Sequence, residues 1–215
     1  MSTSIRLTRL LAFSGALALL VSFGESDAEE QIDKGLVGKS IYTSRELGWT
    51  IEIPKGWTVV SEDKLDGLDK KGLDAIENVA GSIDYSGLKH LISFSKNKFN
   101  IFQSTSEPFD IEYEGQWEEN NSALRDLLLV TYKDQGLRAK ASEISIENVS
   151  GLDFQKYEFT IYSPKGSVII NQLMYSRLIN GLDFGVAINY NNEIDKNILL
   201  GVWRSSRFDS NYNNK

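Results

Sequence analysis

The chain contains no cysteine among its 215 residues, and it has a single histidine, His90. The absence of cysteine excludes disulfides, thiolate metal sites and the acylated cysteine on which a bacterial lipoprotein is anchored. One histidine leaves little room for a catalytic triad, and no Gly-x-Ser-x-Gly nucleophile elbow accompanies it. We therefore interpret His90 as a polar residue of a strand and predict no catalytic residues and no enzymatic activity.

Clustered basic residues are also missing, because the formal net charge is -7 and the lysines and arginines are scattered. A phosphate-binding surface needs such clusters, so nucleic acid is not an expected partner. Neither a dinucleotide-binding glycine fingerprint nor a phosphate-binding loop occurs, and no cofactor is predicted.

The first 28 residues have the pattern of a secretory signal peptide. Arg6 and Arg9 precede an apolar run over residues 10–23, and small residues follow at Ser26 and Ala28. The apolar run falls short of the roughly 20 residues that a stable membrane span needs. We predict cleavage of residues 1–28; a cut after Gly24 and an uncleaved anchor are the alternatives.

The mature chain is therefore expected to be periplasmic or secreted, without stable membrane insertion. Residues 29–39 and 209–215 are polar and are predicted to be flexible ends. Residues 40–208 are predicted to form one domain, since a chain of this size buries roughly 70% of its unfolded surface around one core.

Strand patterns dominate the second half of the chain. Apolar residues alternate with small or polar ones over residues 182–190, and Asn180-Gly181 before them suits a type I′ hairpin turn. Residues 167–179, 152–162 and 140–146 are predicted as three earlier strands, separated by turn signals. The four strands are expected to form an antiparallel meander.

Three helices are predicted around these strands. Leucines repeat at helical spacing within residues 115–135, and Asn191 or Asn192 can cap a closing helix that reaches Trp203. A third helix over residues 61–79 is expected to break or bend at Gly67 and Gly72. Further strands are predicted over residues 49–53, 57–60, 88–95 and 100–103. The expected class is α+β, a mainly antiparallel sheet with helices packed on its faces.

Two stretches resemble the PsbP-like (Mog/PsbP-type) domain family. The first runs from Tyr42 to Trp57 and reads YTSRELGWTIEIPKGW; the second comprises Asn180 to Phe184, Ile188 to Tyr190 and the closing segment Trp203 to Phe208. The resemblance implies an α/β/α sandwich. Members include extrinsic proteins of the photosynthetic oxygen-evolving complex and bacterial envelope proteins of unknown function, so the resemblance also favours a non-enzymatic role.

Acidic residues are further candidates for catalytic or calcium-binding groups. They are Asp63, Asp66, Asp69, Asp74 and the pair Glu118-Glu119. The first four alternate with lysines on an amphipathic segment, which favours a solvated helix face. The spacing from Asp63 to Asp69 lacks the ligand order and closing glutamate of a calcium loop, so no metal site is predicted and calcium is a weak alternative.

The four tryptophans are expected to serve mainly as core. Trp49 and Trp203 occupy apolar positions of their elements, and Trp57 follows a turn. Trp117 stands beside Glu118 and Glu119 and is the weak candidate for a binding residue, exposed at a partner surface. The leading hypothesis is an accessory subunit of an envelope or secreted protein complex. The alternative is a protein that binds a small ligand or lipid in an aromatic-lined pocket between sheet and helix.

Overall fold

The computed structural model describes residues 40–82 and 87–209, apart from the side chains of residues 62, 66, 68 and 69. The predicted signal peptide, the segment 29–39 and residues 210–215 of the predicted tail lie outside the described residues.

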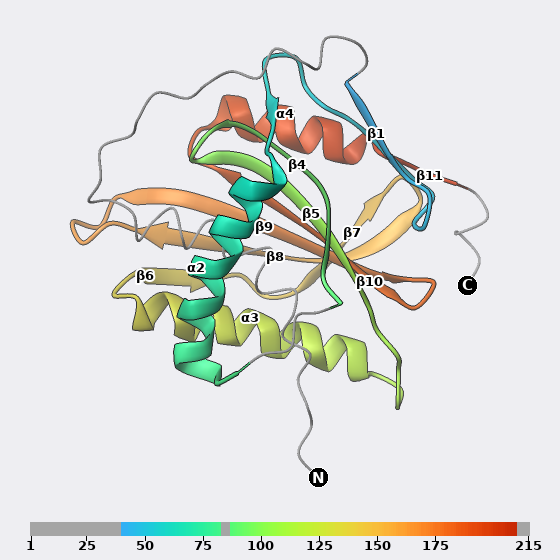
Figure 1. The fold of residues 1–215 in the computed structure, drawn as a ribbon. Helices are drawn as coiled ribbons and strands as arrows, with labels where there is room; N and C mark the ends of the chain where they lie inside the picture. The colour runs from blue at the N-terminus through green and yellow to red at the C-terminus, as the bar shows by residue number, and fades with distance from the viewer. Residues whose placement is uncertain (1–39, 83–86, 210–215) are drawn as a thin grey trace.

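The described chain forms two antiparallel sheets and three helices (Figure 1). The large sheet has the order β3-β4-β5-β10-β9-β8-β6, and β7 also pairs with β8. Its strands are β3 (Thr58–Val59), β4 (Lys89–Asn97), β5 (Asn100–Pro108), β6 (Arg138–Ala141), β7 (Ser145–Val149), β8 (Leu152–Tyr162), β9 (Val168–Ile179) and β10 (Leu182–Tyr190). The small sheet has the order β1-β2-β11, with β1 (Ile41–Ser44), β2 (Trp49–Glu52) and β11 (Arg207–Phe208).

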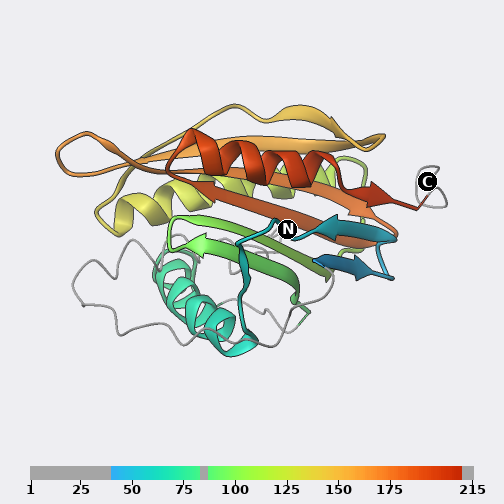
Figure 2. The same ribbon diagram turned by 90° about the horizontal axis from the view of Figure 1, so that it is seen from above.

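The helices lie on both faces of the large sheet (Figures 1 and 2). Helix α4 (Glu193–Arg204) and the small sheet cover one face, and α2 (Glu62–Ala80) and α3 (Gln116–Asp134) lie on the other. This arrangement confirms the predicted α+β fold with helices on both sides of a mainly antiparallel sheet.

An aromatic core fills the space between the large sheet, α4 and the small sheet. Trp49 and Trp203 are fully buried in it, as predicted, and Trp57 is 9% exposed. The Trp49 ring lies 4.9 Å from that of Phe184, and Phe94 stacks on Phe102 at 4.7 Å. Such ring pairs stabilise a core beyond the area that they bury.

A second core lies between α2, α3 and the outer strands of the sheet. Leu124, Leu128 and Tyr132 of α3 pack there against Phe159 of β8 and Met174 of β9. Because residues of a strand alternate between faces, β8, β9 and β10 contribute to both cores.

The predicted meander is confirmed for β8, β9 and β10, which pair in sequence order. Asn180 and Gly181 have φ angles of 52° and 73°, as a type I′ turn requires. Three expectations were wrong. The strand expected over residues 140–146 is divided between β6 and β7, β5 extends beyond residue 103 to Pro108, and β1 and β11 were not foreseen.

Helix α2 also differs from the expectation, because it continues through Gly67 and Gly72 without a break. Glycine lowers helix stability by about 1 kcal/mol, but buried Leu65 and Ile76 pack this helix onto the domain and outweigh that local preference. Ser61 precedes the helix, yet its side chain makes no capping hydrogen bond.

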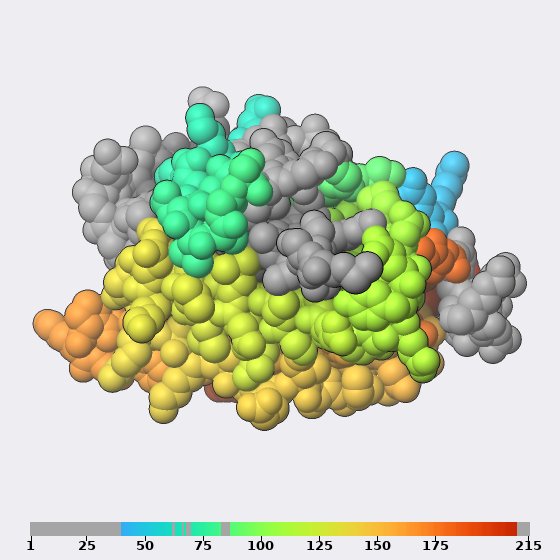
Figure 3. Space-filling view, turned by 90° about the horizontal axis from the view of Figure 1, so that it is seen from below, coloured from blue at the N-terminus to red at the C-terminus, as the bar shows by residue number. Residues whose placement is uncertain are grey.

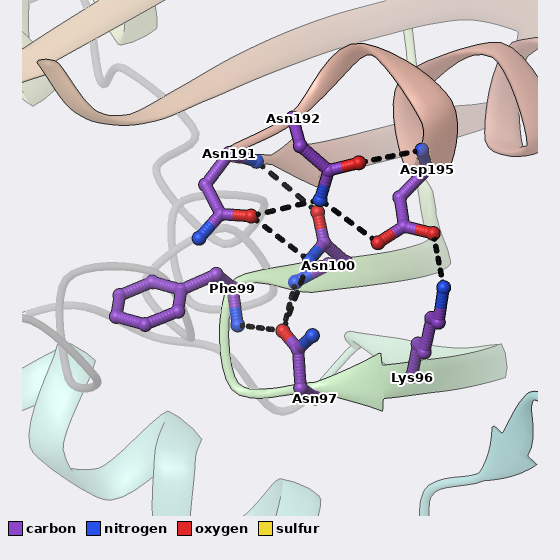
Figure 4. Close-up of polar contacts among 7 residues, drawn as sticks. All are labelled: Lys96, Asn97, Phe99, Asn100, Asn191, Asn192 and Asp195. Atoms are coloured by element: carbon purple, nitrogen blue, oxygen red, sulfur yellow. Dashed lines mark hydrogen bonds and ion pairs between the residues drawn. The ribbon is translucent and has the colours of Figure 1, made fainter.

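Asparagines join the β4–β5 hairpin to the start of α4 (Figure 4). The Asn100 side-chain amide donates to Asn97 Oδ1 and to Asn191 Oδ1, both at 3.0 Å. Asn192 caps α4, as predicted, because its Oδ1 accepts from the backbone N–H of Asp195 at 2.9 Å. The Asp195 carboxylate in turn lies 2.7 Å from Lys96 Nζ. This network fixes the corner between β10 and α4.

Among residues 40–82 and 87–209, no helix is both long enough and apolar enough to cross a membrane.

Candidate functional site

The face of the large sheet that is turned toward α2 and α3 carries an unusual concentration of buried polar side chains. On the opposite face the same strands present Phe102, Phe184 and Val186 to the aromatic core. We call the polar residues together the polar face. They are Ser93, Gln103, Thr105, Glu107, Gln172, Ser176, Asp183 and Asn189, all less than 4% exposed.

Strand register places these residues in rows across the sheet. Thr105 of β5 is opposite Gly185 of β10, and Gly185 is opposite Ser176 of β9. Gln103 is opposite Ala187 in the next row. The central strand β10 therefore places Gly185 between two hydroxyl side chains, and Ala187 between Gln103 and Met174 of β9.

Two carboxylates meet at one end of the polar face. Asp183 of β10 is directly opposite Glu107 of β5, and their exposed fractions are 0% and 3%. Directly opposed residues of an antiparallel pair have Cβ atoms roughly 5 Å apart. This end of the polar face therefore carries negative charge whenever both groups are ionised.

Helix α3 supplies hydrogen bonds to the polar face. Trp117 Nε1 donates to Asp183 Oδ1 at 2.7 Å, and the Asn121 amide donates to the Trp117 carbonyl at 3.0 Å. Ser176 Oγ donates to Asn121 Oδ1 at 3.1 Å. Farther along the helix, the Tyr132 hydroxyl donates to a Gln172 oxygen at 2.8 Å. Burial raises the pKa of Tyr132, so its hydroxyl remains a donor.

The expectation that Trp117 is exposed was wrong, because only 8% of the residue is accessible. Trp117, Asn121, Leu124 and Leu128 follow one another at helical spacing and share the buried side of α3. The helical spacing between Trp117 and Leu124 was the sequence signal that could have indicated this burial. The role of Trp117 as a binding residue stays a prediction.

Several polar-face atoms have no hydrogen-bond partner within the described part of the chain. They are Ser93 Oγ, Gln103 Oε1, Thr105 Oγ1, and both Oδ1 and Nδ2 of Asn189. Buried polar atoms are nearly always paired in folded proteins, so a group of unpaired ones on one surface needs a physical explanation.

The connection between β5 and α3 forms a second candidate site, on the surface. We call residues 109–119 the acidic connection: it contains Asp110, Glu112, Glu114, Glu118 and Glu119 and no lysine or arginine. Between these acidic residues, Ile111 is 54% exposed and Tyr113 is 40% exposed. Glu118 and Glu119, considered above as catalytic groups, are exposed in the first turn of α3.

Local hydrogen bonds hold the acidic connection in place. The Tyr113 hydroxyl donates to Glu119 Oε2 at 2.9 Å, and the Glu112 N–H donates to Gln116 Oε1 at 2.6 Å. Gly115 takes a φ of 86°, a value that side-chain-bearing residues rarely adopt, where the connection turns into α3. The hydrogen bond to Glu119 raises the pKa of Tyr113, because the nearby carboxylate disfavours a phenolate.

A charged cluster joins β7 and β8 to α4 at the other side of the sheet. Glu147 accepts hydrogen bonds from Lys156 Nζ and Arg204 Nε, both at 2.8 Å, and from the Tyr175 hydroxyl at 3.1 Å. Burial raises the pKa of Glu147, but the two cations outweigh burial and hold it below its ordinary value. We interpret this cluster as a structural contact that holds the end of α4 against β7 and β8.

Other sequence candidates do not come together. His90 is half-buried in β4, and Asp63 and Asp74 are exposed on α2. The backbone from Asp63 to Asp69 is helical, which is not the loop that a calcium site of that spacing requires. Within the described ranges, no group of three or more histidine, aspartate or glutamate residues could hold a metal ion.

A surface groove of about 590 Å³ lies at the far end of α3, beside strand β6. It is lined by Leu129, Val130, Lys133, Gly136, Leu137, Arg138 and Ala139. Its lining contains no aromatic residue, so it differs from the aromatic-lined pocket that the alternative hypothesis requires.

Comparison with known proteins supports the fold. No family model matches the chain, and no curated protein is similar to it in sequence. The solution structure of cyanobacterial PsbP (CyanoP) from Synechocystis sp. PCC 6803 matches with a TM-score of 0.54 and 11% identity, over 84% of this chain and 98% of that one. The chain has a PsbP-like fold. At 11% identity the likeness concerns the fold alone, so the expected resemblance is confirmed at that level, and membership of a bacterial envelope group remains a proposal.

Proposed function

We propose that the protein is exported and acts without catalysis, as an accessory subunit of a protein complex in the cell envelope or outside the cell. The signal-peptide pattern of residues 1–28 supports export. The lack of cysteine, the single histidine and the PsbP-like fold favour binding over chemistry.

The acidic connection carries this proposal. Exposed Ile111 and Tyr113 stand among acidic side chains, which matches the usual composition of a protein interface, with an apolar or aromatic centre and a polar rim. The hydrogen bonds to Glu119 and Gln116 order the connection before a partner arrives, which reduces the entropy lost on binding. The exposed Ile111 and Tyr113 favour an apolar partner surface, and the surrounding acidic residues favour a basic rim around it.

In-cell crosslinking tests the proposal. The tagged protein is expressed with its own leader in its native host, crosslinked, purified and examined by mass spectrometry. We expect one dominant partner in the wild type and its loss in the double variant Ile111→Ser/Tyr113→Ser. The matched control is Ile146→Ser/Val168→Ser, which changes two exposed apolar residues, 62% and 50% accessible, on strands β7 and β9. Equal recovery of the partner by both double variants, or recovery of the protein alone, contradicts the proposal.

The same preparation tests export. The intact mass of the purified protein should correspond to a chain that begins near Glu29. A chain that keeps residues 1–28 in the membrane fraction would instead support the uncleaved anchor.

A further inference from the structure

We infer that the polar face binds a small cationic ligand with several N–H donors, such as an elongated amine or guanidine, between strands β5 and β10 and helix α3. This inference does not use the exposed residues of the acidic connection, Ile111 and Tyr113; the two regions meet at Trp117, whose indole N–H donates to Asp183. It starts from the side-chain atoms that remain unpaired inside the domain.

The unpaired atoms are mainly acceptors. Gln103 Oε1 and Asn189 Oδ1 are amide oxygens, and Thr105 Oγ1 can accept as well as donate. Their residues are between 0% and 1% exposed. A buried acceptor without a partner destabilises a protein, so three on one surface indicate a ligand that donates to them.

The shape of the surface suits a ligand that lies along the strands. Gly185 and Ala187 of β10 are the direct neighbours of Thr105 and Gln103, and neither has a side chain longer than a methyl group. The shortest side chains of β10 therefore lie beside Thr105 and Gln103; Ser176 is on the other side of Gly185, and Met174 is on the other side of Ala187. Gln103 and Glu107 are four residues apart on β5, which at about 3.3 Å per residue is about 13 Å, within reach of an elongated diamine.

The buried carboxylates indicate that the ligand carries positive charge. Asp183 and Glu107 face each other at one end of the polar face, and the buried residues of α3 are aromatic, aliphatic, amide or hydroxyl side chains. None of the eight polar-face residues is a lysine or an arginine. Buried carboxylates attract an ammonium or guanidinium group and repel an anion.

The surroundings leave an approach along β4. Figure 3 shows α2 and α3 forming the outer surface on this side. Gly87 is exposed and His90 is half-buried, and His90 is opposite Thr105 in the sheet register. The row that contains Thr105 therefore ends at a partly accessible edge.

Calorimetric titration of the purified, exported protein tests the inference, with agmatine as the probe. Agmatine carries a guanidinium and an ammonium at opposite ends of a short chain. The matched ligands are 1,5-pentanediol, which is neutral, and glutarate, which is anionic. We expect agmatine to bind and the other two not to bind.

Three variants separate binding from stability. Gln103→Leu and Asn189→Leu remove unpaired polar atoms, so each should raise Tm while weakening agmatine binding at least tenfold. Ser106→Ala is the control, because Ser106 Oγ is also buried and unpaired but is opposite Phe184, on the other face of β5. This control should leave agmatine binding unchanged.

The possible results are decisive in either direction. Binding of agmatine that is lost in Gln103→Leu and Asn189→Leu and kept in Ser106→Ala supports the inference. Absence of agmatine binding, tighter binding of the diol or of glutarate, or equal loss in all three variants overturns it. Crosslinking of the protein partner is measured on the same variants, so that failure of this site is distinguishable from failure of the proposed function.

Discussion

Trp203 is the residue on which the aromatic core is centred. Its ring contacts six others, those of Trp49, Phe102, Phe154, Tyr175, Phe184 and Phe208, at centroid distances between 5.1 and 6.5 Å. Because it lies at the end of α4, it ties that helix to both sheets.

Trp203→Ala should lower the free energy of unfolding by about 3–5 kcal/mol, because it leaves a large cavity among rings that cannot close over it. Urea denaturation followed by circular dichroism measures this change. Ile194→Ala on the same helix is the control, since Ile194 is 73% exposed, and it should change stability by less than about 0.5 kcal/mol. A loss below about 1 kcal/mol for Trp203→Ala would show that the core repacks.

Glu147 should make the free energy of unfolding depend on pH in the acidic range. Its folded-state pKa lies below the ordinary value, since Arg204 and Lys156 outweigh the effect of burial. Its contribution is therefore present above the unfolded pKa of about 4.3 and is lost as pH falls through the lower folded pKa. Unfolding free energies of wild type and Glu147→Gln, measured from pH 7 to pH 3, should converge toward the acid end. A constant difference across this range contradicts the assignment.

At this scale the sequence predicted apolar burial better than polar burial. Trp49 and Trp203 were expected in the core and are fully buried. By contrast, the second half of β5 was not predicted, because it contains buried polar residues such as Thr105 and Glu107. Without alternating apolar residues, the pattern on which strand prediction depends is missing. The same buried polar side chains make β5 part of the candidate site.

Among the elements, regular ones were predicted well and interrupted ones were not. Strands β8 and β10 have the expected bounds because each alternates along its whole length. The division between β6 and β7 arises at Ser142, whose backbone N–H bonds Glu158 and whose hydroxyl accepts from the Glu158 N–H. This pair of hydrogen bonds between Ser142 and Glu158 leaves no recognisable pattern in the sequence.

Replacing glycine with alanine should change the stability of the protein in opposite directions at two positions. Gly181→Ala places a side chain at a φ of 73° in the β9–β10 turn and should destabilise the protein by about 1–2 kcal/mol. Gly67→Ala lies within α2, where an added Cβ meets nothing within 4 Å, and should stabilise by about 0.5–1 kcal/mol. Thermal unfolding of both variants checks the pair. Destabilisation by Gly67→Ala would indicate that α2 is strained at this residue.

For the whole molecule, the arrangement of the two cores predicts a single unfolding unit. They share β8, β9 and β10, whose alternate residues face opposite sides, so neither core can be lost without the strands of the other. Tryptophan fluorescence and far-ultraviolet circular dichroism should therefore give coincident urea transitions. The difference between the fluorescence transitions of the wild type and of Trp117→Phe, which keeps the three tryptophans of the aromatic core, reports on the α3 side. A separate, earlier transition of that probe contradicts this prediction.

The pairing of β5 with β10 also has a consequence for how the chain is made. It joins residues 100–108 to residues 182–190, and the small sheet is completed only when β11, at residues 207–208, pairs with β2. A ribosome synthesises the N-terminus first, so the central strand of one sheet and the last strand of the other emerge at the end. Until residues 182–190 have emerged, strands β5 and β9 have no strand between them, and until residues 207–208 have emerged the small sheet lacks β11. Neither sheet can be complete before that point, which favours passage of the emerging chain through a narrow channel.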